Sequence, residues 1–185
     1  MAIGKTRTRI NVKGGDVFKM REISPTPSNT FVDYGSLSSL EFNDVRDMVE
    51  SPDAAGNLVN ANAAGRTVSF TLNLMQTTKE EIDAVAALAD KYFDCIYHVQ
   101  LSVAANYQHL SMCCVKFNPS VQLVYQAGTR REIKLTGYAL APKAAMTRTP
   151  TTYNVVAGVP YIFLDDTTAA TDPSDTAADV ATAVL

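Results

Sequence analysis

The stretch RTVSFTLNLMQTTKEEI at residues 66–82 constrains the fold most, because its hydrophobic period changes partway along it. Over residues 67–74 apolar and polar side chains alternate strictly, which is typical of a strand with one buried and one wet face. The apolar set is Val68, Phe70, Leu72 and Leu74, and the polar set is Thr67, Ser69, Thr71 and Asn73. The alternation predicts that the first set lies in a core and the second set faces water.

A helix start follows this strand directly. Thr77 and Thr78 are candidate N-caps, and Glu80 and Glu81 follow at the spacing of a capping box. Apolar residues then recur at helical spacing, which predicts an amphipathic helix over about 79–93, packed on the outside of a sheet. Its core face carries Ile82, Val85, Ala86, Ala89, Tyr92 and Phe93.

The rest of the chain is predicted to be extended segments separated by loops. Extended segments are predicted at 37–50, 95–104 and 108–117, in a hairpin formed by 120–126 and 130–140, and in a short run at 160–164. Loops are predicted at the Pro-rich segment 24–36 and at the Ala-, Asn- and Gly-rich segment 51–65. The fold class that follows is mainly β: an antiparallel sandwich or barrel of about six to eight strands with one outer helix.

Size and composition favour one globular domain. The 185 residues are 46% hydrophobic, and the mean hydropathy is −0.02, which suits a chain with a sizeable core. No apolar run approaches the length of about 20 residues that a membrane helix needs. No apolar segment follows the basic residues near Met1, so no secretory signal is expected. We expect a basic N-terminal arm and loop at 1–30, a β domain at 31–164 and an acidic tail at 165–185.

Charge is concentrated at the two ends. Residues 1–21 carry six basic side chains and one acidic one, and residues 165–185 carry five aspartates and no base. Opposite charges at the two ends favour self-association by complementarity. The alternative is that both ends are solvated and mobile, since the last dozen residues are mostly Ala, Thr and Asp and are not expected to build a core.

Residues that could carry catalysis or bind a metal do not form a recognisable pattern. Cys95, Cys113 and Cys114 are expected to be small buried hydrophobes, since neighbouring side chains on a strand point to opposite faces. His98 and His109 lie on different predicted strands, and solvated or hydrogen-bonded histidines are expected rather than a zinc site. We therefore expect no enzyme, no cofactor and no metal, although an enzyme whose site is not visible in the sequence stays an alternative.

The order of elements resembles a known family. The run GSLSSLEFNDVRDMVESPDAAGNLVNANAAGRTVSFTLNLMQTTKEEIDAVAALADKY (35–92) and the hairpin QLVYQAGTRREIKLTGYAL (122–140) resemble tail tube proteins of long-tailed bacteriophages. The resemblance covers about residues 30–140. It implies a structural virion protein of the tail, assembled in the bacterial cytoplasm. Such proteins form hexameric rings that stack head to tail, with one continuous β-barrel around a channel that DNA passes through.

The resemblance also implies roles for particular residues. The lumen-facing set would be Thr67, Ser69, Thr71 and Asn73, with Glu41 and Asp47 supplying acidic charge that repels phosphates. The segment 51–65 would be the ring-stacking loop, with Asp53, Asn57, Asn60 and Asn62. The alternative is that this segment is a flexible insertion without a role in stacking. Partners would be further copies of the chain, other tail proteins and passing DNA, with no membrane. Alternatives are another tail or connector component, the tube of a contractile injection machine, or a β-sandwich ligand-binding module.

Overall fold

In the structure, a computed structural model, most of the described residues lie in strands. It describes residues 17–34, 37–52, 58–74, 87–88, 90–100, 107–118, 122–124, 132–166 and 172–185. The strands are β1 (Val17–Ser24), β2 (Val32–Asp33), β3 (Leu37–Pro52), β4 (Leu58–Leu74), β5 (Tyr92–Gln100), β6 (Tyr107–Phe117), β7 (Gln122–Val124), β8 (Glu132–Ala139) and β9 (Ile162–Asp166). A 3-10 helix, η1 (Thr151–Tyr153), and an α-helix, α2 (Ala177–Val184), complete the described elements. The predicted mainly β, antiparallel fold is confirmed.

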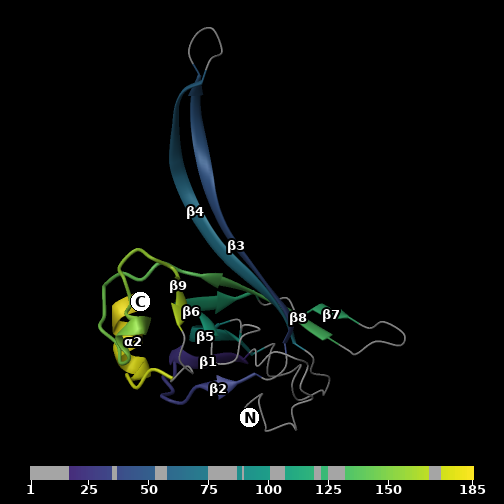
Figure 1. The fold of residues 1–185 in the computed structure, drawn as a ribbon, viewed down its shortest axis with the longest axis vertical. Coiled ribbons are helices and arrows are strands. Elements are labelled where there is room, and N and C mark those ends of the chain that lie inside the picture. Colours follow the sequence, from purple (N-terminus) through teal and green to yellow (C-terminus); the bar gives the residue numbers. More distant parts are fainter. Residues whose placement is uncertain are drawn as a thin grey trace.

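One folded sheet forms two layers. The strand order is β2-β1-β5-β6-β8-β4-β3, with β9 beside β6 and β7 beside β8, and every pairing is antiparallel. Strands β6 and β8 pair only through Val115–Phe117 and residues 137–139. Phe18 on β1 and Phe70 on β4 are not on neighbouring strands, yet their rings are 6.3 Å apart. The sheet therefore turns at the short β6–β8 pairing, so that β2, β1, β5, β6 and β9 form a first layer and β7, β8, β4 and β3 a second (Figure 1).

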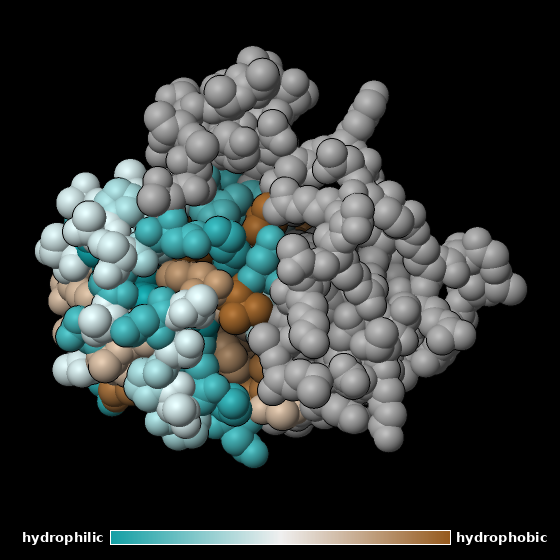
Figure 2. All heavy atoms as spheres, turned by 90° about the horizontal axis from the view of Figure 1, so that it is seen from below, coloured by the Kyte–Doolittle hydropathy of each residue, from teal (hydrophilic) through white to brown (hydrophobic). Residues whose placement is uncertain are grey.

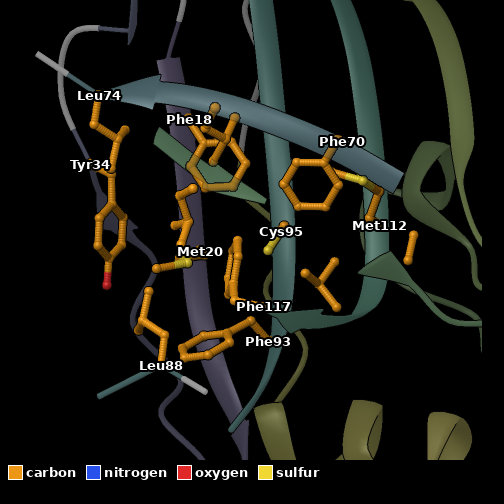
Figure 3. Close-up of a cluster of buried hydrophobic side chains, with 14 of the residues drawn as sticks. Phe18, Met20, Tyr34, Phe70, Leu74, Leu88, Phe93, Cys95, Met112 and Phe117 are labelled. Atoms are coloured by element: carbon orange, nitrogen blue, oxygen red, sulfur yellow. The ribbon is translucent and has the colours of Figure 1, made fainter. Parts of the chain in front are cut away.

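The main core fills the space between the two layers (Figure 3). Phe70 is fully buried there, and its ring lies 5.8 Å from that of Phe117 in an edge-on arrangement. Gly137 is the partner of Phe70 on β8. A Cβ at Gly137 would lie 2.5 Å from the Phe70 ring, so this glycine is the residue that admits the ring. Val68, Phe70, Leu72 and Leu74 are all buried, on the face that the alternation predicts.

The C-terminal residues cover the far side of the first layer. Residues 172–185, named here the C-terminal cover, include α2, whose N-cap Thr176 accepts a hydrogen bond from the Asp179 N–H. They form a second cluster of small apolar side chains with β1 and β6. The buried residues of that cluster are Ile23, Cys113, Cys114, Val155, Ala177, Val180, Ala183 and Val184. The expectation that the last dozen residues cannot build a core is wrong, because small side chains allow α2 to pack closely on the sheet.

A buried ionic cluster fixes the C-terminal cover. Asp94 on β5 pairs with Arg21 on β1 at 2.9 Å and with Arg148 at 2.7 Å, and all three side chains are 0% exposed. Asp175 of the cover pairs with the same two arginines at 2.8 and 3.1 Å. Two cations thus face two anions, as buried charges require. Part of the complementarity between the basic and acidic ends is therefore satisfied within one chain, and these residues are neither solvated nor free for self-association.

The predicted helix over 79–93 is wrong at its end. Residues 79–86 and 89, including the predicted core positions Ile82 and Val85, lie outside the described residues. Residues 87, 88 and 90 form a turn, and β5 begins at Tyr92. Tyr92 and Phe93 pair with Lys116 and Val115 of β6, so long-range pairing, and not the local helical spacing, decides their conformation.

The predicted loop at 51–65 is also wrong for most of its length. Strand β3 continues to Pro52, and β4 begins at Leu58. Asn60 and Asn62 pair with Ser51 and Val49 of β3, whereas Asp53 and Asn57 lie outside the described residues. Ala, Asn and Gly have low strand propensity, but the hairpin continues because each added residue extends an existing ladder.

Candidate assembly surface

Three strands, β3, β4 and β8, form a polar surface on the outer side of the second layer. Strand registers place Glu41, Thr71 and Thr136 in one row across β3, β4 and β8. Side chains in register point to the same face. The polar face, as we name it, consists of Ser39, Glu41, Asn43, Thr67, Ser69, Thr71, Asn73, Lys134, Thr136 and Tyr138.

Side-chain hydrogen bonds connect neighbouring strands of the polar face. The Asn73 amide donates to Ser39 Oγ at 2.8 Å, and the hydroxyls of Thr71 and Thr136 lie 3.4 Å apart. Thr67 and Glu41 are exposed, and Ser69, Thr71 and Asn73 are half-buried. The structure thus brings the sequence-predicted lumen residues onto one continuous face, in contact with water and opposite the core.

The polar face also includes residues that the sequence analysis did not single out. Lys134, Thr136 and Tyr138 extend it onto β8, and Lys116, the register partner of Tyr138, extends it to β6. The signal was present, because EIKLTGYA alternates with the same period of two. Glu41 offsets one of the two lysines, so this face is close to neutral. Asp47, the partner of Gly65, lies farther out along β3.

A two-stranded arm projects from the body of the protein (Figure 1). We define the arm as residues 45–52 of β3 and 58–67 of β4, which pair with each other. Strand β8 pairs with β4 only from Val68 onward. Within the described chain, both edges of the arm are therefore open. Eight residues of β3 at about 3.3 Å per residue reach about 26 Å beyond the body.

Aromatic and charged side chains hold the root of the arm. Arg66 donates two hydrogen bonds to the Asp44 carboxylate, at 2.9 and 2.8 Å, and the Tyr161 hydroxyl donates a third at 2.9 Å. These bonds, chiefly those from Arg66, lower the pKa of Asp44 to about 2. The Tyr161 ring also meets Phe42 edge-on at 4.7 Å. The arm is therefore attached to the segment before β9 as well as to the second layer.

Strand β3 forms a long open edge of the second layer. Among the described strands it pairs only with β4, over its whole length from Leu37 to Pro52. Its sequence carries four carboxylates, Glu41, Asp44, Asp47 and Glu50, against Arg46. Asp47 lies over Gly65 of β4. A Cβ at Gly65 would come within 3.3 Å of the Asp47 Oδ2.

The end of the molecule opposite the arm has a mostly hydrophilic described surface, with its most hydrophobic residues near the middle of the view (Figure 2).

A buried histidine pair lies on the far face of the first layer. His98 and His109 are register partners on β5 and β6, and their Nδ1 atoms are 2.6 Å apart, which confirms the hydrogen-bonded alternative. Burial, then the neighbouring His109, lowers the pKa of His98 to about 4. No group of three or more metal-binding side chains occurs among the described residues.

The cysteines and the cavities show no catalytic arrangement in the described part. Burial raises the pKa of Cys113 to about 12 and that of Cys114 to about 11, so neither thiol is activated. A cavity of about 10 Å³ beside Ser111, Tyr153 and Ile162 has room for about one water molecule. Neither described helix is long and apolar enough to cross a membrane.

Comparisons with known proteins give similar structures but no match by sequence. No protein family matches the sequence, and no curated protein sequence matches it. A chain in the cryo-EM structure of the anti-feeding prophage baseplate, 6-fold symmetrised, is similar with a TM-score of 0.43 and 10% identity, over 75% of this chain and 93% of that one. A similarity at that level says nothing about function. The structural features that bear on function are the polar face, the open β3 edge and the arm.

Proposed function

We propose that the protein is a structural subunit of a phage tail or related injection tube, which forms rings whose channel is lined by the polar face. The observation that carries the proposal is the second layer itself. It is buried on one side, polar on the other, and ends in an open strand of sixteen residues. In a solitary protomer the β3 edge stays open. A ring would cover that edge and keep the polar face in contact with the water of the channel.

Ring closure has a specific route. Strand β3 is one edge of the second layer, and β7, which pairs with β8, is at the other edge. Joining β3 of one copy to β7 of the next continues the antiparallel sheet around a ring. Each copy would then contribute β3, β4, β8 and β7 to the inner wall. Closure satisfies backbone groups that would otherwise invite uncontrolled pairing.

The polar face suits a channel for DNA. Thr67, Ser69, Thr71 and Asn73 are small and uncharged, so they offer phosphates little to bind. Glu41 and Asp47 add repulsion at the β3 side, and Lys134 and Lys116 add attraction at the β8 side. Such a lumen passes DNA without retaining it, because the charges are few and balanced.

Stacking of rings is assigned to the arm. It projects beyond the two layers, and a two-stranded ribbon without further support is marginally stable in water. Packing against the next ring supplies that support. The assignment of segment 51–65 to ring stacking stays a proposal, and its described residues, 51–52 and 58–65, form the outer part of the ribbon.

Size-exclusion chromatography with negative-stain microscopy tests the proposal. The wild-type chain is expected to give rings with a central pore and stacks of rings. A short-arm variant, with residues 48–64 replaced by Asn-Gly so that a two-residue turn follows Asp47, is expected to give single rings. A monomer or dimer without a pore at every concentration would refute the ring, and stacked short-arm rings would refute the role of the arm.

A further inference from the structure

Two titratable side chains of the first layer lie beside the place where the C-terminal cover is tied to the sheet. His98 on β5 and His109 on β6 are register partners, and their rings meet edge-on with centroids 4.7 Å apart. Lys19 on β1 lies on the same face, two residues from the register partner of His98. The Lys19 Nζ contacts the carboxylate of Asp172 in the cover at 2.8 Å. The histidine pair is therefore adjacent to an ion pair that holds the cover.

The hydrogen bond between the two rings suits neutral imidazoles. Their Nδ1 atoms lie 2.6 Å apart, so one ring donates its Nδ1–H and the other accepts. His98 is 5% exposed, and its Nε2 atom is buried without a hydrogen-bond partner among the described residues. A protonated imidazole carries N–H at both ring nitrogens. A charged His98 would therefore place a buried N–H where no described group accepts it, which is costly.

The charges around His98 make a further positive charge unfavourable. Burial is the largest cause that lowers the pKa of His98, and it lowers this pKa to about 4 together with the partner ring of His109 and with Lys19 on β1. Asp172 of the cover acts in the opposite direction. The closed cover therefore leaves the pair neutral at a pH where an ordinary histidine takes up a proton.

The remaining neighbours of the pair come from η1 and β9. The Tyr153 ring of η1 lies 6.2 Å from the ring of His109. Strand β9 places Leu164 in register with His109, and Asp166 occupies the position two residues further along. Among the described side chains, the ion pair between β1 and the cover supplies the charges that act on His98 besides its partner ring.

The cover is attached by separate contacts, since no described strand pairing includes its residues. Asp175 pairs with Arg21 at 2.8 Å and with Arg148 at 3.1 Å. The Ala177 N–H donates to the Asn29 side chain at 2.8 Å. Helix α2 has eight residues, and so short a helix is not stable alone in water. When these contacts are lost, the cover therefore leaves the sheet and α2 unfolds with it.

We propose that the His98–His109 pair is an acid-sensitive latch: a proton taken up by the pair opens the C-terminal cover while the two layers stay folded. In the open protomer His98 reaches water, which accepts the N–H that the closed protomer leaves without an acceptor. Opening also uncovers the apolar cluster beneath α2, which includes Cys113 and Val155. The latch belongs to the single protomer and does not depend on the proposed tube function.

Hydrogen–deuterium exchange tests the latch on the wild-type chain. The pKa of His98 is about 4 in the closed state and about 6.5 for an exposed histidine, so the open state binds more protons and opening increases as the pH falls between these values. These two values predict that the ratio of open to closed cover rises about 70-fold from pH 7.5 to 4.5. The amides of Val180 and Leu185 are hydrogen-bonded within α2. Their protection factors, corrected for intrinsic exchange at each pH, are expected to fall by about that factor.

The amides of Phe70 and Leu72 on β4 are the internal reference. Because the layers stay folded, these amides are expected to keep protection factors at least about tenfold above those of α2 at pH 4.5. Equal protection in α2 and β4 would mean that acid unfolds the whole protomer, and it would overturn the latch. Protection of α2 that does not change with pH would overturn it as well.

Variants separate the histidines from the aspartates of the cover, whose protonation would also break ion pairs. His98→Gln/His109→Gln removes both imidazoles and keeps polar side chains, and the protection of α2 is expected to change less than about fivefold between the two pH values. Asp172→Asn, the matched control, keeps the pair and is expected to retain most of the change. If the control lost the pH dependence and the histidine variant retained it, Asp172 would be the sensor and the latch would be overturned.

Proton NMR gives a readout that needs no variant. The chain has two histidines, and their ring signals are expected to titrate over the same pH range in which α2 loses protection. Ring signals that titrate near pH 6.5 while α2 stays protected would show that the closed protomer accepts the proton. That result would also overturn the latch.

Discussion

The arm and the C-terminal cover have similar compositions, but the arm projects from the body and the cover packs on the sheet. Both are poor in large apolar side chains: residues 58–65 read LVNANAAG, and residues 172–185 consist mainly of Ala, Thr, Asp and Val. The arm extends away from the body and pairs only with itself among the described strands. The cover packs four residues of α2 into a buried cluster.

The difference comes from partners that are distant in the sequence. Asp175 meets Arg21 and Arg148 across 154 and 27 residues of chain, and these contacts hold α2 on the sheet. Among its described side chains, the arm has a similar contact at its root, between Asp44 and Arg66. Composition therefore decides neither outcome. Two buried arginines anchor the cover on the protomer, and no buried arginine anchors the arm among the residues that the structure describes.

The largest expected loss of stability follows from a substitution in the ionic cluster that anchors the cover. Asp94→Ala removes the carboxylate that both Arg21 and Arg148 share, and leaves two buried guanidinium groups with Asp175 alone. We expect a loss of about 3–5 kcal/mol in the free energy of unfolding, measured by urea denaturation. A loss below about 1 kcal/mol would show that the cluster is not needed for stability. The cover would then resemble the arm in lacking a strong anchor.

Asp175→Ala is expected to have a smaller and more local effect. It removes the carboxylate that ties the cover to the arginines, at a cost of about 1–3 kcal/mol. Cys113 and Cys114 lie under α2 in the second cluster, whereas Cys95 lies in the main core. Labelling with a thiol reagent followed by mass spectrometry is expected to reach the first two cysteines and not the third.

Asp172→Ala is the matched control for that measurement. Its ion pair with Lys19 is partly exposed, at 38% and 25% of the side chains, and an exposed pair contributes at most about 1 kcal/mol. The control is expected to keep Cys113 and Cys114 protected. Equal labelling in both aspartate variants would mean that the buried cluster does not anchor the cover.

The sequence predicts what depends on near neighbours and fails where distant partners decide. The alternation over 67–74 correctly identifies the buried and wet faces, because one strand's period is enough to set them. The helix end at Tyr92 and the loop at 51–65 were wrong, because pairing with β6 and β3 overrides local preference. The Asp94 cluster could not be predicted, since nothing in the sequence indicates that Arg21 and Arg148 meet.

Acidification is expected to lower the folding stability by a moderate amount, through the histidine pair in the first layer beneath the cover. The pKa of His98 is about 4 in the fold, against about 6.5 for an unfolded histidine. The native state thus binds fewer protons than the unfolded state in this window, so stability falls as the pH is lowered from about 6.5 to about 4. Tm measured across that range should drop by a few degrees.

A variant without these two imidazoles tests the cause of the pH effect. Replacing both members of the pair, His98→Leu/His109→Leu, removes the titrating groups and keeps side chains of apolar character at two buried positions. The slope of Tm against pH between 6.5 and 4 is expected to flatten in this variant. An unchanged slope would assign the acid sensitivity to other groups, such as the aspartates that hold the cover.

The smallest expected change in the stability of the protomer follows from a substitution in the arm. Val45 on β3 is 53% exposed, so Val45→Ala removes little buried surface, and the free energy of unfolding should change by no more than about 0.5 kcal/mol. Urea denaturation of a dilute, unassembled sample makes the comparison with Asp94→Ala direct. If Val45→Ala destabilised the dilute protomer as strongly as Asp175→Ala, the arm would be supported within its own chain. The contrast between an assembly element and an anchored cover would then fail.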